Sequence, residues 1–126
     1  MHIQRVDDGG AFVERFGYCR ALRAGNMIFV SGTTADDHGA TPSSDVYDQT
    51  MEALTRVVAA IRELADDAVV VRTRVYLADG DTWEDAGRAH REVFGDARPV
   101  NTTVEIGRLI GDGLLVEVEA DAVVPE

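Results

Sequence analysis

Residues 69–95, VVVRTRVYLADGDTWEDAGRAHREVFG, change their hydrophobic period halfway along. Over residues 69–77 the side chains alternate, which is typical of a β-strand with one buried face. The face expected to meet the core carries Val69, Val71, Thr73, Val75 and Leu77. The opposite face carries Val70, Arg72, Arg74 and Tyr76. This stretch therefore predicts a strand followed by a helix. The order of all expected elements, strand-strand-helix-strand-helix-strand-strand, indicates a domain of the α+β class.

Two helices are predicted. The shorter helix covers residues 82–94 of this stretch, and its stripe consists of Trp83, Ala86, His90 and Phe94. The longer helix covers residues 45–65, where apolar residues recur at spacings typical of one helix face. Ser44 precedes it and is the expected N-cap, since serine side chains accept hydrogen bonds from the first turn.

The other apolar segments predict strands. Residues 114–124 alternate in the same way as residues 69–77. Further strands are expected over residues 3–6, 16–24, 26–34 and 101–109. Gly111-Asp112-Gly113 predicts a hairpin turn.

Two helices can cover only one face of such a sheet, so we expect a single mixed sheet with both helices on one face. The uncovered face combines charged residues with apolar ones. Its apolar members are Val70, Tyr76, Leu115 and Val123. A face of this mixed kind is either solvated, with opposite charges paired across strands, or buried in a subunit interface.

Composition favours one domain, residues 1–126. The net charge is −11, from 23 acidic and 12 basic residues, so binding to nucleic acid or to an anionic membrane is not expected. The sequence contains no lysine, which excludes Schiff-base chemistry through that residue. No apolar run has the length of a membrane span, and the N-terminus lacks a signal-peptide pattern. We therefore expect a cytoplasmic protein.

Few residues suggest chemistry by themselves. The three histidines are scattered over the terminus, a loop and a helix, so no metal site is expected. Cys19 is expected in the middle of a strand as a small buried residue rather than a nucleophile. Tyr18 and Arg20 share one face of the same expected strand. They either line a pocket together or form ordinary surface pairs.

Glu117 and Glu119 lie on the polar face of the last expected strand. Paired carboxylates can hold a water molecule or share a proton. The alternative is a set of cross-strand salt bridges with Arg72 and Arg74, which we favour for Glu119.

The order of these segments resembles one known family. FGYCRALRAGNMIFVSGTT, residues 16–34, resembles the glycine-tyrosine start and the serine-glycine strand of the Rid family, the YjgF-type reactive-intermediate deaminases. Residues 69–95 resemble the second strand–helix unit of that family. RPVNTTVEIGRL and LLVEVEADAVV resemble its two closing strands. The resemblance covers nearly the whole chain in order.

This resemblance implies a chorismate-mutase-like fold and a homotrimer, in which the sheets form a central barrel with the helices outside. It places sites in clefts between subunits. It also implies hydrolysis of 2-imino or enamine acids to keto acids and ammonia, without a metal or an organic cofactor.

The site residues of the family correspond to particular positions here. The resemblance assigns Tyr18 and Glu117 as catalytic residues, with Glu117 placing the attacking water. It assigns Gly32 to the ligand-binding backbone. The carboxylate-binding arginine of the family is replaced by Asn101, and the cysteine two positions later by Thr103.

The loss of that arginine changes the expected activity. An arginine binds a carboxylate through two charge-assisted hydrogen bonds, whereas asparagine offers neutral donors. We therefore expect a small polar ligand, held by Asn101, Thr103, Gly32 and Arg20, and doubtful activity as a standard imino-acid deaminase. The alternatives are a hydrolase of other C–N bonds, or a non-catalytic sensor or chaperone-like binding module on the same trimer.

Overall fold

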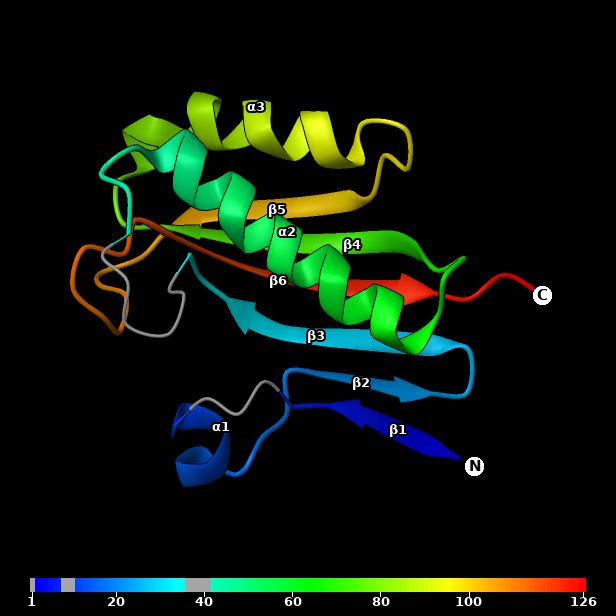
Figure 1. The fold of residues 1–126 in the computed structure, drawn as a ribbon. Coiled ribbons are helices and arrows are strands. Elements are labelled where there is room, and N and C mark those ends of the chain that lie inside the picture. The colour runs from blue at the N-terminus through cyan, green and yellow to red at the C-terminus, as the bar shows by residue number, and fades with distance from the viewer. Residues whose placement is uncertain (1, 8–10, 36–41) are drawn as a thin grey trace.

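The structure, a computed structural model, describes residues 2–7, 11–35 and 42–126. A six-stranded mixed sheet has the order β1-β2-β3-β6-β4-β5 (Figure 1). Its strands are β1 (Ile3–Val6), β2 (Ala21–Ala24), β3 (Met27–Thr33), β4 (Val69–Leu77), β5 (Val100–Glu105) and β6 (Val116–Val123). Strand β5 runs parallel to β4, and the other neighbouring pairs are antiparallel. The expected single mixed sheet is confirmed.

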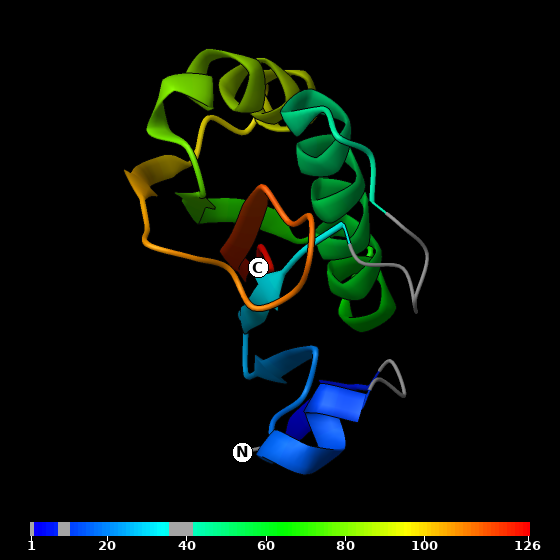
Figure 2. The same ribbon diagram turned by 90° about the vertical axis from the view of Figure 1, so that its left-hand side faces the viewer.

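Helices α2 (Val46–Leu64) and α3 (Trp83–Phe94) lie on the same face of the curved sheet, and no helix of the described residues covers the centre of the opposite face (Figure 2). Both predicted helices are therefore confirmed. The N-cap of α2 is Asp45 rather than Ser44, because the Asp45 side chain accepts a hydrogen bond of 3.1 Å from the Asp48 amide. A short 3₁₀ helix, Gly80–Thr82, precedes α3.

The strand expected over residues 16–24 is wrong in its first part. A short helix, α1 (Ala11–Phe16), ends at Gly17, which has a φ of 78° and donates a hydrogen bond to the Val13 carbonyl. Strand β2 therefore starts only at Ala21. Tyr18 and Cys19 lie in the connection, and Cys19 is half-buried there rather than in the middle of a strand.

The core lies between α2 and the central strands. On β6 the alternation predicted from the sequence is confirmed, since Val116, Val118, Ala120 and Ala122 are all fully buried. They face buried residues of α2 that include Ala53, Leu54, Val57 and Ile61. Small side chains on the strand let the helix approach closely, so this layer positions α2 and, beside it, α3.

Strand β4 departs from the predicted alternation at its start. A β-bulge between Val70 and Arg72 inserts Val71 without a partner on β6. The bulge moves Val70 into the core, where it is 7% exposed, and leaves Val69 and Val71 exposed. The predicted faces of these three residues are therefore wrong, whereas the alternation is regular from Thr73 onward.

The turn at residues 111–113 is not a hairpin, because β4 lies between β5 and β6 in the sheet. The buried side chain of Gln49 organises this loop instead. Its Nε2 donates to the carbonyls of Ser43 (2.6 Å) and Gly113 (2.7 Å), and its Oε1 accepts from the Leu115 amide (2.8 Å). Leu115 packs against the core, so its expected position on the open face is wrong.

The face of the sheet without helices combines charge and apolar surface, as expected. Arg74 pairs with Glu119 and Asp121, and Arg72 pairs with Asp121. Exposed apolar side chains on the same face are Phe29, Val100 and Val104, at 44%, 56% and 42% exposure. This face therefore carries the surface expected of a subunit interface.

The loop expected over residues 33–45 includes residues 36–41, with His38, which lie outside the described residues. Among the helices of the described part, none is long and apolar enough to cross a membrane.

Candidate functional site

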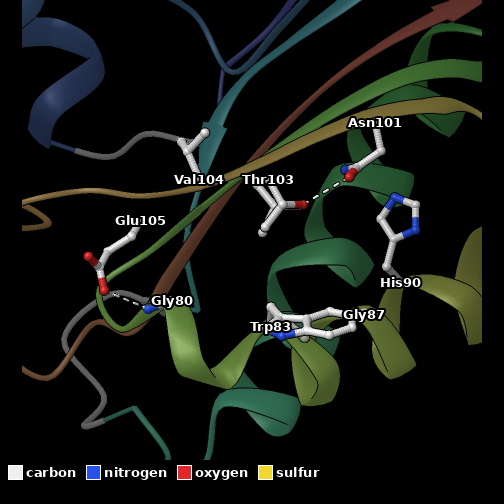
Figure 3. A pocket seen from close by; sticks show the side chains of 10 residues that line it. Gly80, Trp83, Gly87, His90, Asn101, Thr103, Val104 and Glu105 are labelled. Carbon is white, nitrogen blue, oxygen red and sulfur yellow. Dashed lines mark hydrogen bonds between the residues drawn. The ribbon is translucent and has the colours of Figure 1, made fainter.

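A pocket of about 540 Å³ opens between α3 and the edge strand β5 (Figure 3). Its lining consists of Val75, Gly80, Trp83, Ala86, Gly87, His90, Asn101, Thr103, Val104 and Glu105. The strand supplies its polar wall and the helix supplies its aromatic and small residues. The size is suitable for a small metabolite.

A chain of hydrogen bonds fixes the polar wall. The Nδ2 of Asn101 donates to the Thr73 hydroxyl at 3.0 Å, and the Thr103 hydroxyl donates to the Oδ1 of Asn101 at 2.9 Å. The Thr73 hydroxyl also lies 2.8 Å from the Nε2 of His90. Thr73 is fully buried, and the bonds to Thr73 and Thr103 together hold the Asn101 amide in one orientation. The second N–H of that amide is then available to a ligand.

The lining of this pocket contains few charged groups. Burial lowers the pKa of His90 below its usual range, which favours the neutral imidazole. Glu105 is the charged side chain of the lining, and its carboxylate accepts a hydrogen bond of 2.9 Å from the Gly80 amide. No arginine belongs to the lining formed by the described residues. The pocket therefore offers hydrogen bonds without a cation.

The helical wall is open at its centre. Gly87 lies one helix turn after Trp83, and apart from the backbone of the helix itself nothing lies within 4 Å of the position where a Cβ on Gly87 would be. Trp83 is 60% exposed. A glycine in a helix interior lowers the stability of the helix by about 0.5–1 kcal/mol relative to alanine. Gly87 therefore leaves space in the pocket at the expense of helix stability.

A second group of functional candidates lies on β3, on β6 and just before β2. Arg20, only 8% exposed, donates to the Gly32 carbonyl (3.1 Å) and to the Thr33 hydroxyl (2.7 Å). The Glu117 carboxylate covers Gly32 so closely that a Cβ there would lie 2.5 Å from Glu117 Oε2. Gly32 thus makes room for Glu117, and the structure brings Arg20, Gly32 and Glu117 together.

Within this group, Glu117 is the acid whose pKa is shifted. Burial, followed by the charge of Glu119, raises the pKa of the Glu117 carboxyl, while Arg20 acts in the opposite direction. Glu119 is engaged elsewhere, since it accepts a hydrogen bond from the Tyr76 hydroxyl and pairs with Arg74. A carboxyl with a raised pKa is a suitable proton acceptor or water-positioning group near neutral pH.

The two groups lie on opposite faces of the sheet. Asn101 is in register with Thr73, on the helix side, whereas Glu117 is in register with Tyr76, on the open side. Within one chain Asn101 and Glu117 therefore do not share a cleft. The ring of Tyr18 lies edge-on against Phe16, with centroids 6.3 Å apart, in the connection before β2.

Sequence reasoning missed the helical half of the pocket. His90 and Trp83 were expected only as members of a helix stripe. In the structure His90 lies against the Thr73 hydroxyl of β4 and packs edge-on against Phe94. Their spacing from Gly87, four residues after Trp83 and three before His90, places all three on one helix face. This spacing, with a glycine between two ring-bearing residues, is the sequence feature that could have indicated the helical wall of the pocket.

The protein is of the α+β class: two helices cover one face of a mixed sheet, and a polar pocket lies beside its edge strand. A family model described as "Endoribonuclease L-PSP" matches residues 11–124. The crystal structure of Rv2704 from Mycobacterium tuberculosis, described as a member of the YjgF/YER057c/UK114 family, has 40% sequence identity and a TM-score of 0.88, covering 98% of this chain and 100% of that one.

The chain is also similar to curated proteins over most of its length. An uncharacterized protein of Streptomyces coelicolor is 38% identical over 95% of this chain and 91% of its own length. A RutC family protein of Pyrococcus horikoshii is 34% identical over 83% of this chain and 85% of its own length. The chain belongs to the YjgF family, also known as the Rid or RutC family. The resemblance read from the sequence is confirmed.

Proposed function

We propose that this chain forms a cytoplasmic homotrimer that binds, or hydrolyses, a small uncharged polar metabolite in clefts between subunits. Asn101 and Thr103 of one subunit orient the ligand. Tyr18, Gly32, Arg20 and Glu117 of the next subunit complete the site, with Glu117 positioning a water molecule.

The observation that carries this proposal is the polar wall without a cation. Asn101 is fixed by Thr73 and Thr103, and Glu105 is the only charged residue in the described lining. The Arg20 guanidinium of the next subunit is bonded to the Gly32 carbonyl and the Thr33 hydroxyl. A ligand carboxylate held by the Asn101 wall would therefore lose its hydration without gaining a charged partner from that wall. An amide, carbonyl or hydroxyl group would instead pair with the Asn101 N–H.

The positions of the Asn101 wall and of the group around Glu117 support a cleft that is assembled from two chains. They lie on opposite faces of one sheet, so a shared site needs a neighbouring chain. The exposed apolar residues of the open face, Phe29, Val100 and Val104, supply the surface for that contact.

The family model carries the word endoribonuclease, but a ribonuclease role is disfavoured here. The net charge is −11, whereas affinity for RNA comes mainly from cations that neutralise phosphates.

Light scattering tests the assembly. At micromolar concentration we expect the mass of three chains, because an open face with this much exposed apolar surface is unfavourable in water. Replacing Phe29 with Glu should weaken the trimer, whereas the same charge at the exposed Phe12 of α1 serves as the control. A monomeric wild-type protein would contradict both the interface and the shared cleft.

A coupled assay tests the chemistry. The wild-type protein should release ammonia from freshly generated 2-iminopropanoate at close to the spontaneous rate, because the pocket lacks a cation for its carboxylate. Each missing charged hydrogen bond costs about 1.5–3 kcal/mol, or about 10- to 150-fold in binding. Rapid wild-type turnover would show that the pocket accepts carboxylates and would refute the proposed ligand class.

A further inference from the structure

The pocket contains an unfilled space whose shape is set by the helix. Above Gly87, apart from the backbone of α3 itself, no atom lies within 4 Å of the position that a Cβ would occupy. On one side of this space is Trp83, and on the other is His90 (Figure 3). The space is therefore bounded by two rings along one face of α3.

Trp83 provides an apolar wall for this space. It is 60% exposed at the start of α3, although it lines the pocket. Indole rings bind planar groups by offset or edge-to-face stacking. A flat ligand would cover this exposed surface better than a puckered one of the same composition.

The strand opposite supplies hydrogen bonds at the edge of the same space. Asn101 presents one free N–H, because its other groups are held by Thr73 and Thr103. The neutral state of His90 and the carboxylate of Glu105 add no positive charge to this wall.

We propose that the pocket selects a planar ligand with an uncharged amide-like group, and that Gly87 is the residue that determines this specificity. The ring lies over Gly87 against Trp83, and the carbonyl of the ligand accepts a hydrogen bond from Asn101. This inference rests on the proposed function and adds the shape of the ligand to it.

Three probes of similar size separate shape from charge: benzamide, benzoate and cyclohexanecarboxamide. The chain contains one tryptophan, so its fluorescence, excited at long wavelength, reports on Trp83 in this pocket alone. We expect benzamide to change the fluorescence saturably. Benzoate and cyclohexanecarboxamide should bind about tenfold more weakly or worse, because the first lacks a charged partner and the second does not stack.

Substitutions at Gly87 locate the binding. Gly87→Leu should fill the space and weaken benzamide binding about tenfold or more. Gly87→Ala is the matched control, since it gives a similar gain in helix propensity with little added volume. Both variants should melt no lower than the wild type. Thr103→Leu, which narrows the same space from the strand, provides a second block if Gly87→Leu alters the trimer.

The outcomes separate the two proposals. Equal binding of benzoate and benzamide would overturn the uncharged ligand class and with it the proposed function. Equal binding of cyclohexanecarboxamide, or benzamide binding that survives both Gly87→Leu and Thr103→Leu, would overturn only the inference about shape and Gly87. If none of the probes binds, the inference fails, and the ammonia assay decides the proposed function independently.

Discussion

Replacing Gln49 with leucine should destabilise the protein by about 3 kcal/mol. Gln49 is fully buried, and its side chain bonds three backbone groups from two loops: the Ser43 carbonyl, the Gly113 carbonyl and the Leu115 amide. Leucine has a similar volume, so the change removes the hydrogen bonds without leaving a large cavity.

The expected magnitude follows from the groups left behind. A buried polar group that loses its partner costs about 1–3 kcal/mol. Leu115 precedes β6 and is half-buried, so its amide bears most of this cost, whereas water replaces part of what Gly113 loses at the surface. Because a domain has only about 5–15 kcal/mol of stability, the loss would be a large share of the total.

Urea denaturation at a fixed protein concentration measures this effect, since the stability of an oligomer depends on concentration. Thr55→Ala is the matched control on the same helix. Thr55 is exposed, and its hydroxyl donates to the Met51 carbonyl one turn earlier, so its effect should stay within about 0.5 kcal/mol. Equal stability of Gln49→Leu and Thr55→Ala would show that the two loops do not depend on Gln49.

The parts of the fold that could be predicted are those in which one side of an element is buried along its whole length. Helix α2 and strand β6 have this property, and their periods in the sequence match their buried faces. Helix α1 has only six residues, too few for a period to emerge. The bulge at Val71 was hidden because three consecutive valines look the same whichever of them points inward.

The candidate site was predictable by residue type but not by face. Asn101 and Thr103 were expected to act together, and they do form one hydrogen-bonded wall. Which side of the sheet that wall faces depends on the register between β5 and β4, and the spacing along one chain carries no information about it. Arg20, by contrast, lies against Gly32 because β2 and β3 are neighbours both in the sequence and in the sheet.

Replacing Asn101 with arginine should raise imine hydrolysis well above the wild-type rate. The new guanidinium would extend from β5 into the pocket and offer a carboxylate two charge-assisted hydrogen bonds, which we expect to improve its binding by about 10- to 150-fold for each bond that forms. The substitution removes the Asn101 bond to Thr73, but the Thr73 hydroxyl keeps its bond to His90. The fold should therefore tolerate it.

The comparison that tests the mechanism uses three variants in the coupled 2-iminopropanoate assay. Asn101→Gln lengthens the side chain without a charge and should stay at the wild-type rate, so a gain by Asn101→Arg alone would identify the cation as its cause. Adding Glu117→Ala to Asn101→Arg should abolish the gain while leaving substrate binding intact, because Glu117 acts on the water rather than on the carboxylate. A gain that persists without Glu117 would show that the carboxylate covering Gly32 does not belong to the catalytic cleft, and that the shared site of two chains is assigned incorrectly.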